Sequence, residues 1–139
     1  MNGFLSENTL TTLVKSYQSA NTTAVNSDGV DMQGYDGVLF VVALGTAAAN
    51  NTVNAAQGAD NSADWTDLEG TSVASGSNKL VLLDVGKPTD RYIRCEVARG
   101  TSTTVDAIIA IRYRARTLPV DNTDGASVEQ HFQPDEGTA

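Results

Sequence analysis

Turn residues divide this sequence into short apolar, β-branched segments, and that pattern constrains the fold more than any other feature. The strongest segment, 38–44, has seven consecutive apolar residues between two glycines. It is too short and too rich in valine for a helix, and a strand without alternation is typical of a central strand buried on both faces. Roughly seven to nine such segments, about 8–12 residues apart, predict a single all-β domain: an antiparallel β-sandwich or a jelly-roll-like barrel.

The other segments differ in how clearly they predict a buried face. Strands are expected at 30–32, 52–57, 65–68, 79–85, 91–97 and 105–115, with 79–85 as a second core strand. Clean alternation in 91–97 predicts that Ile93, Cys95 and Val97 face the core. In the last strand, the residues expected to point inward are Ala107, Ile109, Ile111 and Tyr113, and those expected to point outward are Arg112 and Arg114.

The two ends of the chain differ from its middle. Residues 1–20 are expected to form an N-terminal arm or a first strand, because the apolar spacing suits a helix or a strand and the threonine content favours the strand. Residues 21–118 are expected to form the β-sandwich domain. Residues 119–139 are acidic and have no apolar period, so we expect an extended tail that is flexible or becomes ordered on a partner.

Charge is distributed unevenly along the chain. The net charge is −8, made up of −7 over residues 1–70, +4 over 71–116 and −5 over 117–139. The basic middle is either a solvated strand face or a surface that meets an acidic neighbour, and both remain open. An acidic chain without a basic, aromatic stacking surface is not expected to bind nucleic acid. No apolar run reaches the roughly 20 residues that span a bilayer, so no membrane span is expected.

Few residues of this chain are able to do chemistry. The one histidine, His131, lies in the unpatterned tail, and Cys95 lies on the apolar face of a strand, where a buried hydrophobe is favoured over a nucleophile. We therefore expect no catalytic residue, no cofactor and no transition-metal site. The acidic segment 60–69 has oxygen ligands for Ca²⁺, but its spacing favours a solvated loop. Trp65 and Tyr35 are either a stacking surface for sugars or part of the core and its rim.

Four stretches of the sequence resemble small structural proteins of tailed-bacteriophage virions. They are 26–42, 55–68 with its Trp-Thr-Asp-Leu ending, 90–97, and the closing strand through 111–113. The resemblance implies a capsid decoration (cement) protein or other head protein that is not an enzyme. It also implies the major capsid protein and further copies of this chain as partners, with a closed ring such as a trimer as the expected oligomer. The implied location is the capsid surface of the virion, after synthesis in the reducing cytoplasm of a bacterial host, which suits a chain with one cysteine.

Residues in two regions are candidates for an interface. Arg112, Arg114 and Arg116 are expected to form an outward row that docks on acidic residues of a neighbour, or else an ordinary solvated strand face. Phe4 and Leu5 are apolar candidates in the N-terminal segment. Two other functions remain open: a head–tail connector, neck or tail subunit, and a carbohydrate-binding module for host attachment.

Overall fold

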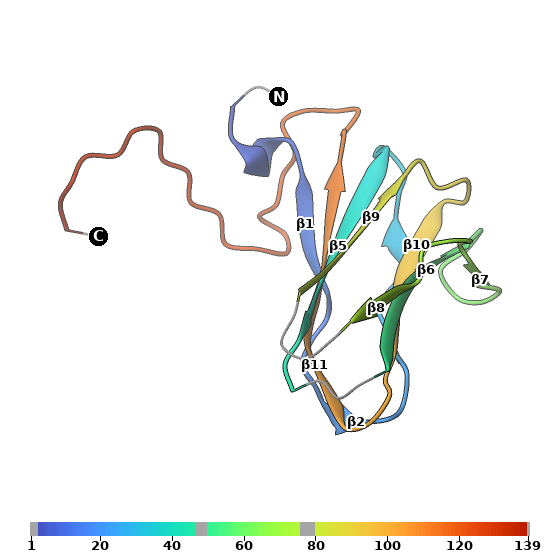
Figure 1. Ribbon diagram of the computed structural model, residues 1–139. Helices are drawn as coiled ribbons and strands as arrows, with labels where there is room; N and C mark the ends of the chain where they lie inside the picture. Colours follow the sequence, from blue (N-terminus) through green and yellow to red (C-terminus); the bar gives the residue numbers. More distant parts are fainter. Residues whose placement is uncertain (1–2, 47–49, 76–79, 139) are drawn as a thin grey trace.

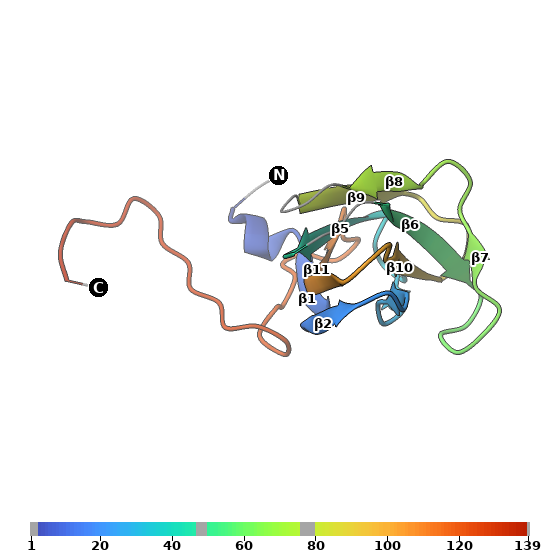
Figure 2. The same ribbon diagram turned by 60° about the horizontal axis from the view of Figure 1, so that its bottom comes forward.

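The computed structural model describes residues 3–46, 50–75 and 80–138. Over these ranges the chain forms eleven strands and one short 3₁₀ helix, η1 (Leu5–Glu7). The strands make two antiparallel sheets that pack face to face (Figures 1 and 2). The predicted all-β sandwich is therefore confirmed, and because the sheets remain separate layers, the architecture is not a closed barrel.

Sheet A has four long neighbours in the order β1–β11–β5–β9. Their bounds are Leu10–Lys15 for β1, Thr103–Tyr113 for β11, Gly37–Leu44 for β5 and Leu80–Gly86 for β9. A further strand, β2 (Gln18–Asn21), pairs with the first part of β11. The N-terminal segment thus provides strands of sheet A, and the last strand of the chain lies between the first strand and β5.

Sheet B follows the order β3–β10–β6–β7, with β4 also beside β10 and β8 also beside β6. The bounds are Val25–Asn26 for β3, Val30–Asp31 for β4, Asn51–Gly58 for β6, Thr66–Asp67 for β7, Val73–Ser75 for β8 and Tyr92–Ala98 for β10. The strands at both edges of sheet B are only two or three residues long. Such short edges limit pairing with a strand of another chain.

The core lies between the inner faces of the two sheets. Phe40, Ile93 and Ile108 are its largest fully buried side chains. The predicted alternation in 91–97 is confirmed, because Ile93, Cys95 and Val97 are all fully buried. Burying apolar surface contributes about 25 cal/mol per Å², so this layer is the main source of stability.

The position of β5 is as predicted, but its burial is not. β5 lies between β11 and β9, and its inner side chains, Val38, Phe40, Val42 and Leu44, are buried. Its outer side chains, Leu39, Val41 and Ala43, are only half-buried. The prediction of burial on both faces is wrong because none of the described residues forms a layer over the outer face of sheet A (Figure 2).

β9 is an edge strand rather than a core strand. Val81 and Leu83 are buried against sheet B, whereas Leu80 and Leu82 are 65% and 61% exposed. Lys79, predicted to begin this strand, lies outside the described residues. β9 is apolar on both faces, so its sequence resembles that of a strand covered from both sides.

Over most of β11, the side chains point to the opposite face from the one predicted. A register shift between Val105 and Ala107 acts as a β-bulge against β5. The extra residue reverses the alternation, so Ile108 and Ala110 become the buried residues that follow Val105. The residues predicted to point inward therefore face outward, namely Ala107, Ile109, Ile111 and Tyr113, and Arg112 points inward at the end of the core.

Packed structure continues a few residues past the boundary expected at 118. The buried Asn122 side chain accepts a hydrogen bond from the backbone N–H of Thr11 at 2.8 Å. It also donates to the carbonyl oxygens of Ser6 and Thr9 at 2.7 and 2.8 Å. Beyond it, residues 123–138 run away from both sheets (Figures 1 and 2).

Candidate interaction surface

The outer face of sheet A is an apolar surface built from strands in register. Leu13 of β1 lies opposite Ile109 of β11, Ile109 lies opposite Val41 of β5, and Val41 lies opposite Leu82 of β9. This central row therefore places four large apolar side chains across four strands. The rows on either side add Leu39, Ala43, Leu80, Ala107 and Ile111.

Exposure of this face is greatest at its two margins. Leu13 is 58% exposed on one edge of the central row and Leu82 on the other, while Ile109 and Val41 between them are half-buried. The row that contains Ile111 and Leu39 ends in Asp84. Single exposed leucines are normal on protein surfaces, but a continuous apolar face on a chain of net charge −8 indicates a contact surface.

The outer face of sheet B has a different composition. Arg94 and Glu96 project from β10 and form an ion pair at 3.3 Å. Asn54 of β6 donates from its amide to Asp67 at 3.1 Å. Burial raises the pKa of Glu96, and the Arg94 charge acts in the opposite direction. Sheet B thus has the polar outer face of a solvated sandwich, and sheet A does not.

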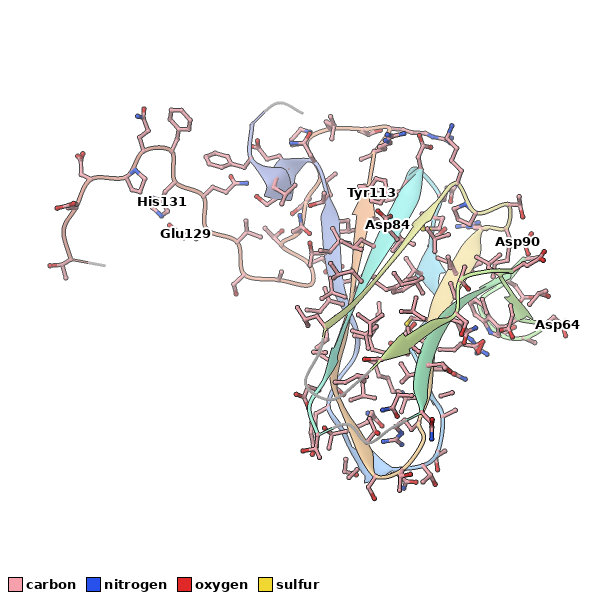
Figure 3. The ribbon with its side chains drawn as sticks, in the orientation of Figure 1. Asp64, Asp84, Asp90, Tyr113, Glu129 and His131 are labelled. Atoms are coloured by element: carbon pink, nitrogen blue, oxygen red, sulfur yellow. The ribbon has the colours of Figure 1, made fainter. Side chains whose placement is uncertain are left out.

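Tyr113 closes one end of the apolar face. Gly37 and Gly86 lie in register with Tyr113, and the tyrosine ring fills the space beside Gly37. The Tyr113 hydroxyl donates to Oδ1 of Asp84 at 2.6 Å, and Figure 3 shows these two side chains together on sheet A. Burial and this hydrogen bond raise the pKa of Tyr113 to about 12.

A small hollow continues the apolar face beyond Tyr113. It has a volume of about 410 Å³ and is lined mainly by Leu5, Tyr113, Arg114, Ala115 and Leu118. The helix η1 positions Leu5, because Thr9 Oγ1 donates to the Leu5 carbonyl at 2.9 Å. We call this feature the Leu5–Leu118 hollow.

The three predicted interface arginines do not form one row, since β11 ends at Tyr113. Arg112 is half-buried: it donates to the Asp31 carbonyl at 2.9 Å and lies over the Tyr35 ring at 5.3 Å. Burial lowers the pKa of Arg112. It therefore supports the end of the core, and the prediction that it lies in an outward docking row is wrong.

The remaining interface candidates lie at separate places. Arg114 is exposed with a φ of 52° and lines the Leu5–Leu118 hollow, so the fold brings Arg114 and Leu5 together. Arg116 is 74% exposed and forms an ion pair with Asp36 at 3.4 Å. Phe4 is half-buried at the start of η1 and is not among the residues that line the hollow.

A second hollow, of about 730 Å³, carries charges of both signs. Lys87, Arg91 and Arg116 line it together with Asp36 and Asp90. Much of this charge is already paired, because Arg91 binds the carboxylate of Asp31 at 2.8 Å, which lowers the pKa of Asp31. The mixture of charges gives the hollow no preference for an anion or a cation.

Groups that could do chemistry are scattered over the described part of the chain. His131 contacts Glu129 at 2.8 Å on the C-terminal segment, away from the sheets (Figure 3). Cys95 is fully buried, and burial raises its pKa to about 12, so its thiolate is disfavoured at neutral pH. Among the described residues, no group of three or more His, Cys, Asp or Glu side chains is placed to hold a metal ion.

The two aromatic residues proposed for sugar stacking are already in contact with arginines. The Arg94 guanidinium lies 4.7 Å from the Trp65 ring centre on sheet B. Tyr35 packs against the core beside Arg112. The rings therefore belong to different environments, and the geometry does not join them into one platform.

Sequence reasoning missed the outer face of sheet A, although a signal for it existed. Strands 38–44 and 79–85 are apolar at both odd and even positions, and the sequence contains no convincing helix to cover a second face. Comparison with known proteins adds no family: no family model matches this chain, and no curated protein matches it. None of the helical structure in the described ranges is long and apolar enough to cross a membrane.

Proposed function

We propose that this chain is a non-enzymatic structural protein of a phage virion, which decorates and stabilises the icosahedral head by binding the outer surface of the capsid lattice. The observation that carries the proposal is the uncovered apolar face of sheet A. Apolar surface left in water costs free energy that burial against a partner recovers. A sandwich with such a face is suited to being one part of a larger assembly.

The extended C-terminal segment also supports an assembly role. Phe132 on this segment is 82% exposed and lies among acidic residues. A segment of this kind adds contact area when it becomes ordered on a partner, without enlarging the domain's own core. Many copies bound to one lattice gain further from multivalency.

The assignment to a phage head depends on the resemblance of 26–42, 55–68, 90–97 and 111–113 to virion structural proteins. On this proposal the partners are the major capsid protein and further copies of the chain, and the location is the capsid surface. A neck or tail subunit would use the same surfaces. Its copy number would differ, since a ring needs roughly a dozen copies and a lattice needs hundreds.

Copy number in purified particles tests the proposal. Quantitative mass spectrometry against the major capsid protein should find hundreds of copies in a fixed ratio to the shell subunit. Roughly a dozen copies would move the protein to the neck or tail. Its absence from particles would overturn the virion role altogether.

Binding to capsids that lack the protein provides a second test. Purified chain should bind saturably, and a variant shortened to end at Ala126 should bind more weakly because it has lost Phe132. The matched control is Asp64→Asn, in an exposed loop on the opposite side of the body from that segment (Figure 3). No binding of the wild-type chain at micromolar concentration would exclude decoration.

A further inference from the structure

We propose that the outer face of sheet A binds the same face of a second copy of this chain. This inference rests on the proposed function in one respect: it takes the chain to be an assembly subunit and names the partner at one of its surfaces. The contact is isologous, meaning that both copies contribute the same residues, and it closes at two subunits. On this proposal the oligomer is a dimer rather than the trimer implied by the resemblance.

The row arrangement makes the face complementary to itself. Leu13, Ile109, Val41 and Leu82 lie in one line across the strands. A two-fold axis in the contact plane, whether along or across the strands, brings this row onto the same row of the partner. Sheets that pack in this way lie about 10 Å apart with their strands within about 30° of each other, and apolar side chains fill the gap.

Charge favours a second copy at this face over other parts of the surface. Two chains of net charge −8 repel each other, and the repulsion is weakest where the contact surface is free of unpaired carboxylates. The central row carries no charged residue. Of the carboxylates at the margins, Asp84 is bonded to Tyr113, and Asp106 at the bulge accepts a hydrogen bond from Thr104. The outer face of sheet B would bury the Arg94–Glu96 pair, at a cost in desolvation.

The area of the face suits a reversible dimer. Four strands about 4.8 Å apart, over seven residues that each rise about 3.3 Å, cover about 450 Å² on each copy and about 900 Å² in a pair. Specific interfaces bury about 1,200–2,000 Å², and weaker ones fall below that range. The Leu5–Leu118 hollow adjoins the face through Tyr113 and adds contact at its end. We therefore expect dissociation in the micromolar range.

The chain's own C-terminal segment is the main competing occupant. In both views it runs away from the sheets, and a hydrogen bond from Gln130 to Ser6 at 2.7 Å connects it to the body (Figures 1 and 2). If it bound the face of a neighbour, Phe132 would be its anchor, because that is its most exposed large apolar side chain. A substitution at Phe132 therefore separates this arrangement from direct contact between two faces.

The test measures mass against concentration for purified wild-type chain, Leu82→Asn and Phe132→Asn. Both substituted side chains are more than half exposed, so neither variant should disturb the fold. We expect a wild-type dimer, an increase of about tenfold or more in the dissociation constant for Leu82→Asn, and no change for Phe132→Asn. The inference would be overturned if the wild-type chain were a monomer at 100 µM, about a hundred times a micromolar Kd, or if it were a trimer. It would also be overturned if Leu82→Asn dimerised as tightly as the wild type, or if Phe132→Asn lost the dimer.

Cross-linking locates the contact independently. Val41→Cys, at the centre of the row, should be linked between copies by a short bis-maleimide for either direction of the two-fold axis, whereas Thr52→Cys on the outer face of sheet B should not. The native Cys95 is buried and should not react. Equal cross-linking of both variants would contradict the assignment of the face.

Capsid binding by the same variants separates this inference from the proposed function. A chain that is monomeric in solution but needs Leu82 to bind capsids would mean that the capsid protein covers the face, so the function would stand and the self-contact would fall. A Leu82-dependent dimer that binds no capsid would mean that the self-contact stands and the proposed function falls.

Discussion

At the scale of single residues, Tyr113 and the glycines beside it set the surface of sheet A. The ring of Tyr113 occupies the space that a side chain at Gly37 would need. An aromatic residue over a strand glycine replaces the packing that the glycine lacks and helps to hold the register. The hydroxyl then reaches Asp84 on the next strand but one, so one side chain connects three strands.

Gly37→Ala should destabilise the protein. The added methyl group would overlap the Tyr113 ring, and overpacking of this kind costs about 1–3 kcal/mol. Gly86→Ala is the matched control, because its methyl group would be 3.9 Å from the Tyr113 hydroxyl, an ordinary contact. Urea unfolding should show the loss for Gly37→Ala alone; equal stability of the two variants would mean that the ring moves aside freely.

Tyr113 should also make stability depend on pH in the alkaline range. Its pKa is raised from 10.0 to about 12, so the folded state favours the neutral phenol. Its contribution is fully present below the unfolded pKa and is lost as pH rises toward the folded pKa, that is, between about 10 and 12. Tyr113→Phe should reduce the slope of unfolding free energy against pH in this window and cost about 0.5–1.5 kcal/mol at neutral pH through the lost hydrogen bond. If Tyr113→Phe left this slope unchanged, groups other than Tyr113 would be responsible for the loss of stability at alkaline pH.

At the scale of elements, the bulge in β11 decides which residues of that strand are buried. Uninterrupted alternation places Ile109 inside, whereas the register shift between Val105 and Ala107 places Ile108 inside. The shift also sends Arg112 toward the core and leaves Ile109 and Ile111 on the outer face of sheet A. The apolar surface thus depends on one extra residue in one strand.

Alanine substitutions at neighbouring positions test the bulge. Ile108→Ala should cost about 2–5 kcal/mol, because it leaves a cavity in a fully buried site. Ile109→Ala should cost much less, about 1 kcal/mol, when measured at a concentration where the chain is monomeric, since that side chain is only half-buried. Chemical denaturation compares the two. If Ile109→Ala cost more stability than Ile108→Ala, the strand would instead follow uninterrupted alternation, with Ile109 buried.

At the scale of the whole molecule, the C-terminal region has two parts with different roles. Residues up to Asn122 fasten the end of the chain to η1 and the first strand, through the Asn122 side chain and a hydrogen bond from Val120 N–H to the Glu7 carbonyl at 2.8 Å. Residues 123–138 extend from this point, away from the sheets (Figure 1). Stability is thus assigned to residues up to Asn122, and partner binding is our proposal for the segment that follows.

Two truncations should separate these roles. A chain that ends at Ala126 keeps the Asn122 contacts, so its unfolding free energy should stay within about 0.5 kcal/mol of the full chain. A chain that ends at Thr117 loses those hydrogen bonds and should be less stable by roughly 2–4 kcal/mol. Thermal or urea unfolding measures both, and equal stability of the two truncations would show that Asn122 does not fasten the fold.

Features that depend on local pattern could be predicted from the amino-acid sequence. Alternation in 91–97 runs without interruption, so the buried set of Ile93, Cys95 and Val97 could be predicted, and a seven-residue apolar run bounded by glycines was enough to place β5. The all-β sandwich follows from many such segments together. These features are set by neighbours in the chain, which the sequence shows directly.

Features that depend on partners distant in the chain could not be predicted in this way. The bulge in β11 arises from pairing with β5, more than fifty residues earlier, and Asn122 finds its partners more than a hundred residues away. A strand can be apolar on both sides, but the number of layers in the fold decides whether both sides are covered. In the described structure, β5 and β9 have a layer over one side only. The apolar face of sheet A was therefore present in the sequence as composition, but it became a surface only through the pairing and packing of the whole chain.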